Sequence, residues 1–222
     1  MKKIYFLLNH PLEFKAQSYC DKYLFDCDIS YGTSLPIDAQ KIDLVIPWNY
    51  KKIIKNYKYN NVIVFHSSDL PEGKGWAPIF NVFNKKLKEY VISAILMDES
   101  VDSGDVVAKA RFEIKNTYTA NFIRKVDERI TIMMISKIIE KFEGVAITGI
   151  KQDNAKETYY KRRYPENNKL NITKCLESLM PILKACEDNH PAFFEYEGDE
   201  FIISIKPKAP PTFPEDLEIV FS

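Results

Sequence analysis

The sequence predicts an α/β layered fold over residues 1–150, followed by a smaller appendage. Short apolar runs alternate with helical patterns through residue 150, which is typical of a sheet flanked by helices. Residues 62–65 form an unbroken β-branched and aromatic run, as expected for a strand covered on both faces. Near residue 150 the composition changes to a polar, charged stretch over residues 151–171. We therefore divide the chain into residues 1–150 and an extension of residues 151–222.

The first 150 residues contain strands and helices in alternation. The predicted strands cover residues 3–8, 28–31, 42–46, 62–65, 90–97 and 106–114. The predicted helices cover residues 12–24, 78–83 and 119–142. The last helix has the clearest pattern, because apolar residues recur at spacings of three and four, at Ile123, Val126, Ile130, Met134 and Ile138. Thr119 is its predicted N-cap, and its methionines are assigned to core packing rather than to a cofactor.

The extension is predicted to contain a helix and a hairpin. Residues 173–185 have a helical pattern that Pro181 should kink or divide. Residues 193–196 and 201–205 flank a turn sequence and predict a β-hairpin. Four prolines between residues 207 and 214 predict an extended tail.

The composition narrows the classes of partner. The 31 basic and 31 acidic side chains cancel to a net charge of zero, so we expect neither nucleic acid nor a membrane as a partner. The four cysteines form no CxxC pair, which argues against a zinc site or a disulfide framework and favours reduced thiols. The apolar run at the amino terminus stops after five residues, short of the ~7–15 that a signal peptide needs. We expect a cytoplasmic protein without a metal.

A histidine and a glycine-containing loop follow the fourth predicted strand. His66 stands at the carboxyl end of that strand, where ligands bind in open α/β sheets. The loop after it contains Pro71 and Pro78, which stiffen the backbone, and Gly73 and Gly75, which allow a close approach or a positive φ. A histidine that only ends a strand and bonds to backbone is the simpler interpretation.

A second polar turn joins the next two predicted strands. It reads Asp-Ser-Gly-Asp at residues 102–105, preceded by Val101. Aspartate and glycine are common turn formers, so this turn alone does not indicate a function. The combination of this turn with His66 and its loop is a more specific indication of function than the turn alone.

These segments resemble the folate-dependent formyltransferase family. The resemblance lies in H-x-S-x-L-P at residues 66–71, G-x-G-W-x-P at 73–78 and V-D-S-G-D at 101–105, and it is strongest over about residues 40–115. A second similarity, to the amino-sugar branch, lies in YYKRRYPE at 159–166 and HPAFF at 190–194. The resemblance implies a Rossmann-like mixed sheet flanked by helices, with a small C-terminal helix plus β-hairpin extension. It also implies N10-formyltetrahydrofolate as the formyl donor.

Features that the sequence lacks favour one branch of that family. The purine-precursor enzymes carry a glycine-rich phosphate loop after the first strand, whereas here no glycine precedes Gly32. The methionyl-tRNA enzymes carry a longer basic C-terminal domain, whereas this chain has a neutral overall balance and a proline-rich tail. A nucleotide-linked amino sugar remains as the acceptor, of the kind used in bacterial surface glycans. The loop at residues 67–76 most resembles formyltransferases of pseudaminic-acid and flagellar glycan pathways.

The resemblance assigns the chemistry to His66 and Asp102. A histidine can hold or release a proton near neutrality, and Asp102 would orient it or relay the proton of the amine. The family has an asparagine two positions before the histidine, and that position here is Val64. Ser67, Ser68 or a backbone N–H of the loop could stabilise the developing oxyanion instead.

The remaining candidates would hold the two substrates. By resemblance, the folate would lie between Trp48 and Tyr50 on one side and Asp98 and Val101 on the other, although both aromatic residues could equally pack beneath the loop. Positive charge for the anionic ligands would come from Lys74, Arg162 and Arg163, next to Tyr160. Trp76 would stack on a base or anchor the loop.

Two other interpretations stay open. The departure at Val64 is compatible with a catalytically weakened family member that binds folate or a nucleotide sugar. The motif match could also be accidental, in which case His66 and Asp102 would lie far apart in the fold. The sequence leaves the nucleotide, the sugar and assembly as a homodimer undecided.

Overall fold

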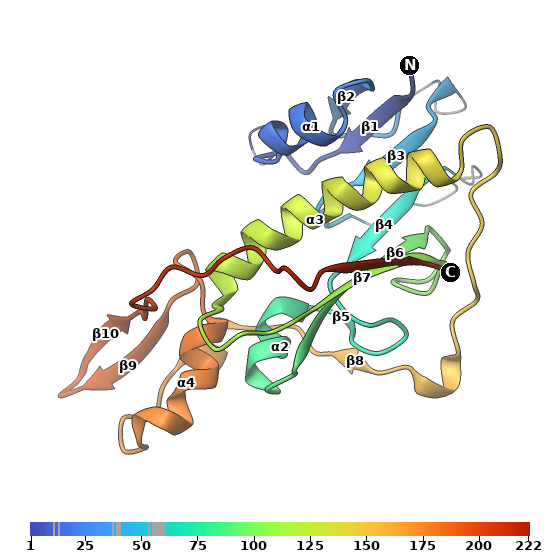
Figure 1. Cartoon of the computed structure of the whole chain (residues 1–222). Helices are drawn as coiled ribbons and strands as arrows, with labels where there is room; N and C mark the ends of the chain where they lie inside the picture. Colours follow the sequence, from blue (N-terminus) through green and yellow to red (C-terminus); the bar gives the residue numbers. More distant parts are fainter. Residues whose placement is uncertain (11, 13, 37, 39–40, 53, 55–60) are drawn as a thin grey trace.

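A computed structural model gives the structure of the chain, and it describes residues 1–222 except 11, 13, 37, 39–40, 53 and 55–60. Its centre is a mixed sheet in two parts (Figure 1). The first part is parallel, in the order β2 (Asp28–Gly32), β1 (Lys3–Leu7) and β3 (Leu44–Pro47). The second part is antiparallel, in the order β4 (Ile63–His66), β6 (Glu89–Leu96), β7 (Val106–Glu113) and β11 (Glu218–Phe221).

The two parts of the sheet meet between β3 and β4. Val45 and Val62 form a parallel bridge, and the Val45 N–H donates to the Asn61 carbonyl oxygen over 2.8 Å. The strand β4 therefore lies near the middle of the whole sheet, as the sequence predicted. Val64 and Phe65 are only half-buried, so the strand is covered less completely than its apolar run suggested.

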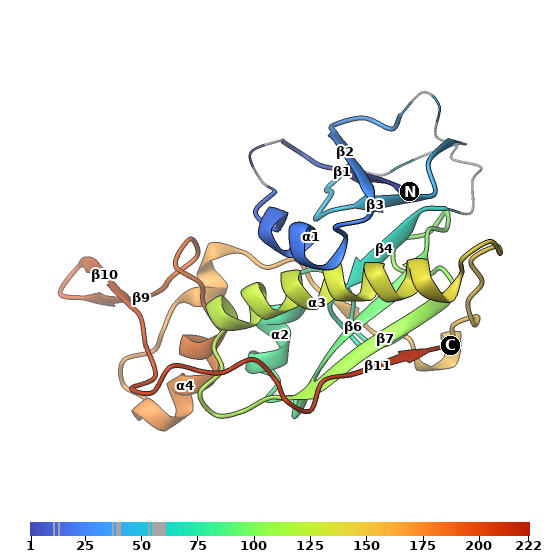
Figure 2. The same ribbon diagram turned by 45° about the horizontal axis from the view of Figure 1, so that its top comes forward.

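One long helix crosses the sheet. The helix α3 (Ala120–Lys141) lies over the sheet, with α1 (Gln17–Tyr23) beside it (Figure 2). Its predicted apolar positions are buried in the main core, where they pack with sheet residues such as Ile92, Ala108 and Ala110. Thr119 has the extended backbone of an N-cap, but its side chain makes no capping hydrogen bond.

The extension packs against the first 150 residues. The short strand β8 (Tyr159–Tyr160) pairs with β5 (Lys74–Gly75), and α4 (Leu176–Ala185) contacts α2 (Pro78–Asn84). Two 3₁₀ turns, Asn154–Lys156 and Pro165–Asn168, lie on either side of β8. The predicted hairpin is formed by β9 (Ala192–Tyr196) and β10 (Asp199–Ile203).

Several predicted boundaries were wrong. The first helix begins at Gln17 rather than near residue 12, although residues 11 and 13 lie outside the described part. The helix α4 begins only at Leu176, because the Asn171 side chain accepts hydrogen bonds from Thr173 and fixes a turn there. Pro181 does not divide α4, which runs unbroken to Ala185; the carbonyl that loses its helical partner belongs to the exposed Glu177.

The end of the chain contains a strand that the sequence did not reveal. The predicted extended tail leads into β11, which pairs antiparallel with β7 at the edge of the sheet (Figure 2). Among the described residues, no helix is long and apolar enough to cross a membrane. The same part of the chain contains no cluster of three or more side chains able to ligate a metal.

Candidate active site

His66 and Asp102 lie together at the carboxyl end of β4. The Nδ1 atom of His66 is 3.5 Å from the Asp102 Oδ2 atom, and both side chains are about nine-tenths buried. On the other side of the ring, Nε2 is 2.8 Å from the carbonyl oxygen of Gly73. A carbonyl oxygen only accepts hydrogen bonds, so Nε2 carries a proton in this arrangement. The imidazole is therefore held between two oxygen atoms.

Asp102 is presented by the turn between β6 and β7. Its backbone is left-handed, with φ of 55°, and its Oδ2 atom accepts a 2.9 Å hydrogen bond from the Gly75 N–H. Gly104 lies so close to the Leu96 carbonyl that a Cβ atom would stand 1.6 Å from its oxygen. The turn thus requires glycine at this position, and it joins His66 to the loop at Gly75 through one carboxylate.

The loop after His66 is fixed by β8. Gly73 and Gly75 have positive φ angles, and both lie against Tyr160, where a Cβ atom on either would come within 3 Å of it. The predicted need for glycine in this loop is confirmed. The Gly73 N–H also donates to the Thr158 hydroxyl over 2.8 Å, and the peptide bond between Leu70 and Pro71 is cis. Tyr160, which the sequence analysis assigned to substrate binding, therefore packs against the backbone of this loop and supports it.

The two serines after His66 differ in what their hydroxyl groups contact. Ser67 donates to the Asp127 carboxylate over 2.7 Å, and the same Oδ2 atom accepts a 2.6 Å bond from the Tyr90 hydroxyl. Burial raises the pKa of the Asp127 carboxyl group, and these hydroxyl groups oppose that shift. The Ser68 Oγ atom is fully buried without a partner in the described region.

Two predicted cations are held by protein groups. The side chain of Lys74 is buried, with the residue 1% exposed, and its Nζ atom lies 2.9 Å from Glu157. The guanidinium group of Arg163 lies 4.0 Å from the Phe80 ring centre and donates twice to Asn168. Burial lowers the pKa of Arg163. Both side chains thus have structural partners in place of an anionic ligand.

Arg162 is placed differently from its neighbour. Its guanidinium carbon lies 5.0 Å from the ring centre of Trp76, which is 52% exposed, and 5.8 Å from that of the exposed Tyr164. We call Trp76, Arg162 and Tyr164 the aromatic–arginine cluster. Trp76 belongs to the loop after His66, so the cluster and the His66–Asp102 pair are joined by one short segment.

The predicted folate-binding residues are divided among three places. Asp98 and Val101 are exposed in the turn that carries Asp102. Trp48, in contrast, is 7% exposed and packs on Phe6 and Phe14 in the main core, which agrees with the packing interpretation. Tyr50 is half-buried, in a smaller apolar cluster with Tyr5 and Val45.

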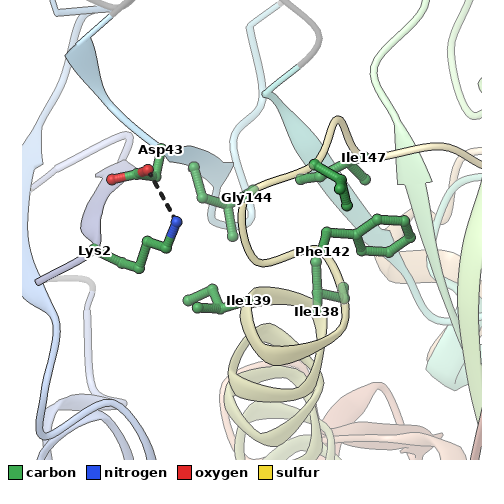
Figure 3. Close-up of a pocket in the computed structure, with 9 residues that line it drawn as sticks. Lys2, Asp43, Ile138, Ile139, Phe142, Gly144 and Ile147 are labelled. Atoms are coloured by element: carbon green, nitrogen blue, oxygen red, sulfur yellow. Dashed lines mark ion pairs between the residues drawn. The ribbon is translucent and has the colours of Figure 1, made fainter.

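A pocket of about 300 Å³ lies at the opposite end of the strands from His66, where the parallel strands begin (Figure 3). The end of α3 and the starts of β1 and β3 form it, with the ion pair between Lys2 and Asp43 on one side. The lining is otherwise apolar, with side chains such as Ile138 and Phe142. None of the predicted site residues lines this pocket.

The sequence analysis missed Gln152, Asp127 and Tyr90. Gln152 donates to the carbonyl oxygens of Asp102 and Gly104, Asp127 accepts from Ser67, and Tyr90 donates to Asp127. Asp127 and Gln152 follow the motifs in the sequence, whereas Tyr90 lies between them. The only signal in the sequence was the polar residue at position 127 within an otherwise apolar helical face.

Comparisons with known proteins identify the type of fold. No family model matches the sequence. A methionyl-tRNA formyltransferase of Methylacidiphilum infernorum is 24% identical over 160 residues, which cover 70% of this chain and 50% of the relative. One from Lachnospira eligens is 28% identical over 66% of this chain and 46% of the relative. The chain spans about half the length of these curated relatives.

Solved structures match over nearly the whole chain. Methionyl-tRNA formyltransferase from Clostridium thermocellum has a TM-score of 0.74 with 23% identity and covers 100% of both chains. A 4-N formyltransferase from Francisella tularensis has a TM-score of 0.70 with 17% identity, over 94% of this chain and 99% of the other. HypX from Aquifex aeolicus with tetrahydrofolic acid has a TM-score of 0.73 with 18% identity, over 96% and 40%. The predicted resemblance and the α/β fold class are confirmed.

Proposed function

We propose that this chain, which has the fold of the formyltransferases, moves a formyl group from N10-formyltetrahydrofolate to the amine of a nucleotide-linked amino sugar. The observation that carries the proposal is the His66–Asp102 pair, whose members are 36 positions apart in sequence and 3.5 Å apart in space. The pair lies at the carboxyl end of a central strand, where α/β sheets bind ligands. It also rests in a fold that the formyltransferases share.

The exposed turn that carries Asp102 is where a folate donor would bind beside the pair. The exposed turn with Asp98 and Val101 leads directly to Asp102, whereas Trp48 is committed to the core. When bound, N10-formyltetrahydrofolate supplies an activated formyl carbon. The chain itself has to bind the acceptor amine near Asp102, accept its proton and stabilise the negative charge that develops on the formyl oxygen.

The geometry of His66 indicates how these tasks are divided. Asp102 accepts from the Gly75 N–H and faces the Nδ1 atom of His66, which fixes the orientation of the ring. The Nε2 proton is donated to the Gly73 carbonyl oxygen. In a complex with substrate, this contact would be exchanged for one to the reacting oxygen, so that the imidazole stabilises its charge. Asp102 then accepts the proton of the amine, directly or through water. The new bond from the amine nitrogen to the formyl carbon replaces the bond from that carbon to N10, and N10 would leave with a proton.

The aromatic–arginine cluster supports a nucleotide as part of the acceptor. An exposed indole ring offers a stacking surface for a base, and the guanidinium group of Arg162 suits a phosphate. The curated relatives act, by their names, on methionyl-tRNA, and the matched part of this chain covers about half of their length. A net charge of zero disfavours a large polyanion such as tRNA. A solved structure named as a sugar N-formyltransferase, from Shewanella, agrees with a smaller acceptor.

The test is a formylation assay on purified protein with the folate donor and a set of nucleotide-linked amino sugars. Mass spectrometry should detect an N-formyl amide, and His66→Ala and Asp102→Asn should each lower the rate by about 10²- to 10⁴-fold. Lys137→Ala, a change on the exposed side of α3, is the control for folding and handling. Formylation of methionyl-tRNA with no sugar product would contradict the acceptor assignment.

Val64 favours a second candidate, a weakened family member that binds folate or a nucleotide sugar. Val64 lies two residues before His66 on β4 and packs in a small apolar cluster with Leu70, Ile95 and Val106. It offers no hydrogen-bond donor at the position where the family has an asparagine. Because one oxyanion donor is worth about 10²- to 10³-fold in rate, Val64→Asn distinguishes the candidates. A gain of that size from a nearly inactive protein supports the weakened member, and little change supports a different donor group in an active enzyme.

A further inference from the structure

Gln152 joins the segment after α3 to the turn that carries Asp102. Its Nε2 atom donates to the carbonyl oxygen of Asp102 over 2.9 Å and to that of Gly104 over 2.7 Å. The residue is 7% exposed, so water competes little for these bonds. One buried amide therefore binds the turn at two points, on either side of Ser103.

The backbone around Gln152 is docked firmly on β7. Ile150 and Val106 exchange both backbone hydrogen bonds over 2.8 Å, two residues before Gln152. Gly149 approaches so closely that a Cβ atom would stand 2.7 Å from the Val106 carbonyl oxygen. The backbone just before Gln152 is thus held by its pairing with β7, and this pairing places the Gln152 amide at the turn.

The orientation of the Gln152 amide follows from its partners. Both groups that it meets are carbonyl oxygens, which only accept hydrogen bonds, so the NH₂ end has to face them. The Oε1 atom is buried and has no partner in the described region. A flipped amide would place this oxygen against two other oxygens, and it would lose both hydrogen bonds. The two bonds to the turn are therefore the interaction that fixes this side chain.

The turn needs such support because its backbone is strained. Asp102 has a φ of 55°, which is uncommon for a residue other than glycine. Its carboxylate faces His66 at 3.5 Å and accepts from the Gly75 N–H at 2.9 Å. A change of the backbone at Asp102 would move the carboxylate away from both. The Gln152 amide binds the carbonyl of this same strained residue.

We propose that Gln152 is a positioning residue that holds Asp102 in the conformation that faces His66. This inference rests on the proposed function, in which Asp102 accepts the proton of the amine. Gln152 does not touch the reacting atoms and acts only through the turn. A misplacement of a catalytic group by about 1 Å can cost about 10²-fold in rate. We therefore expect the loss of Gln152 to lower kcat and to leave KM nearly unchanged.

Two variants separate positioning from packing. Gln152→Met keeps the length of the side chain and removes both donors. Gln152→Glu keeps the shape, but its ionised carboxylate faces two carbonyl oxygens, and it regains one donor when it is protonated. We expect kcat to fall by about 10- to 100-fold in both at about pH 8. As the pH is lowered towards about 6, the ratio of kcat in Gln152→Glu to wild-type kcat should rise, because a carboxyl group beside two carbonyl oxygens protonates more readily. The same ratio for Gln152→Met should stay flat.

Gln17→Met is the matched control, since Gln17 is exposed on α1 and its side chain bonds to Asp21 and Tyr31, neither of which belongs to the site. It should keep wild-type kcat at each pH. Equal kcat in Gln152→Met and wild type would overturn the proposal, as would parallel pH dependence of the Gln152→Met and Gln152→Glu ratios.

Amide hydrogen exchange gives a readout that does not depend on activity. The Gly75 N–H is bound by the Asp102 carboxylate, so its protection should fall in Gln152→Met while that of core amides such as Ile92 is retained. Unchanged protection of Gly75 would contradict the positioning role even if activity fell. A wild-type protein without formyl transfer would refute the proposed function alone, because the exchange of Gly75 would still test Gln152.

Discussion

Lys74 illustrates, at the scale of single residues, how a partner distant in sequence changes the role of a side chain. Its place between two glycines in a loop suggested a cation free to bind an anionic ligand. In the fold its Nζ atom is buried, lies 2.9 Å from Glu157 and lies 5.7 Å from the Tyr159 ring centre. Glu157 is 83 positions away, so no local pattern in the sequence could indicate the pairing.

The Lys74–Glu157 pair predicts a dependence of stability on pH. The hydrogen bond from Lys74 lowers the pKa of Glu157 below its ordinary value of 4.5. A lowered carboxyl pKa adds stability above the ordinary value, and this contribution is lost as the pH falls through the lowered pKa. Glu157→Gln should therefore be less stable than wild type in urea unfolding at neutral pH, and the difference should shrink on acidification. Glu166→Gln, for which no ion pair is observed in the described region, is the control. A difference that stays constant down to about pH 3 would contradict this role.

At the scale of elements, β11 shows what an extended tail can become. The four prolines before it correctly predicted an irregular segment, but the last strand was missed. This short alternating apolar segment forms a strand because it pairs with the free edge of β7, which lies more than a hundred residues earlier in the sequence. Ile219 and Phe221 turn towards the main core, where Phe221 packs edge-on against Phe142, whereas Val220 is exposed.

The two faces of β11 predict unequal effects when a residue on each face is replaced by threonine. Ile219→Thr removes apolar contact with the core and should lower the free energy of unfolding by about 1 kcal/mol or more. Val220→Thr changes an exposed position with similar β propensity and should stay within about 0.5 kcal/mol. Equilibrium denaturation in urea measures both. Equal effects would mean that β11 does not pack on the core as the structure shows.

At the scale of the whole molecule, the extension and the first 150 residues share several contacts. The strand β8 pairs with β5, α4 contacts α2, and β11 completes the edge of the sheet. Arg124 on α3 also binds Glu187, just after α4, through two nitrogen atoms at 2.9 and 3.1 Å. The division at residue 150 stays a proposal about sequence organisation, and these contacts favour folding as one unit.

Two buried cysteines can test this cooperativity. Cys20 lies in the main core and Cys186 follows α4, and burial raises the thiol pKa of both, that of Cys20 to about 12. Both should become reactive to a thiol reagent at the same urea concentration if the chain unfolds in one step. The exposed Cys175, whose pKa is lowered by hydrogen bonds from Ser178, should react without unfolding and serve as an internal control. Exposure of Cys186 at a lower urea concentration than Cys20 would show that the extension unfolds separately.

Local patterns were enough to predict the order of most strands and helices and to place His66 and Asp102 at the ends of elements where they could meet. These features depend on local periodicity, on turn chemistry and on a recognisable spacing of motifs. Which side chains have partners became clear from the fold alone. Ser67 meets Asp127 across 60 positions, Gln152 meets Asp102 across 50, and Trp48 and Lys74 are buried rather than open to ligands. Burial and hydrogen bonding between distant segments depend on how the layers pack, which no local pattern encodes.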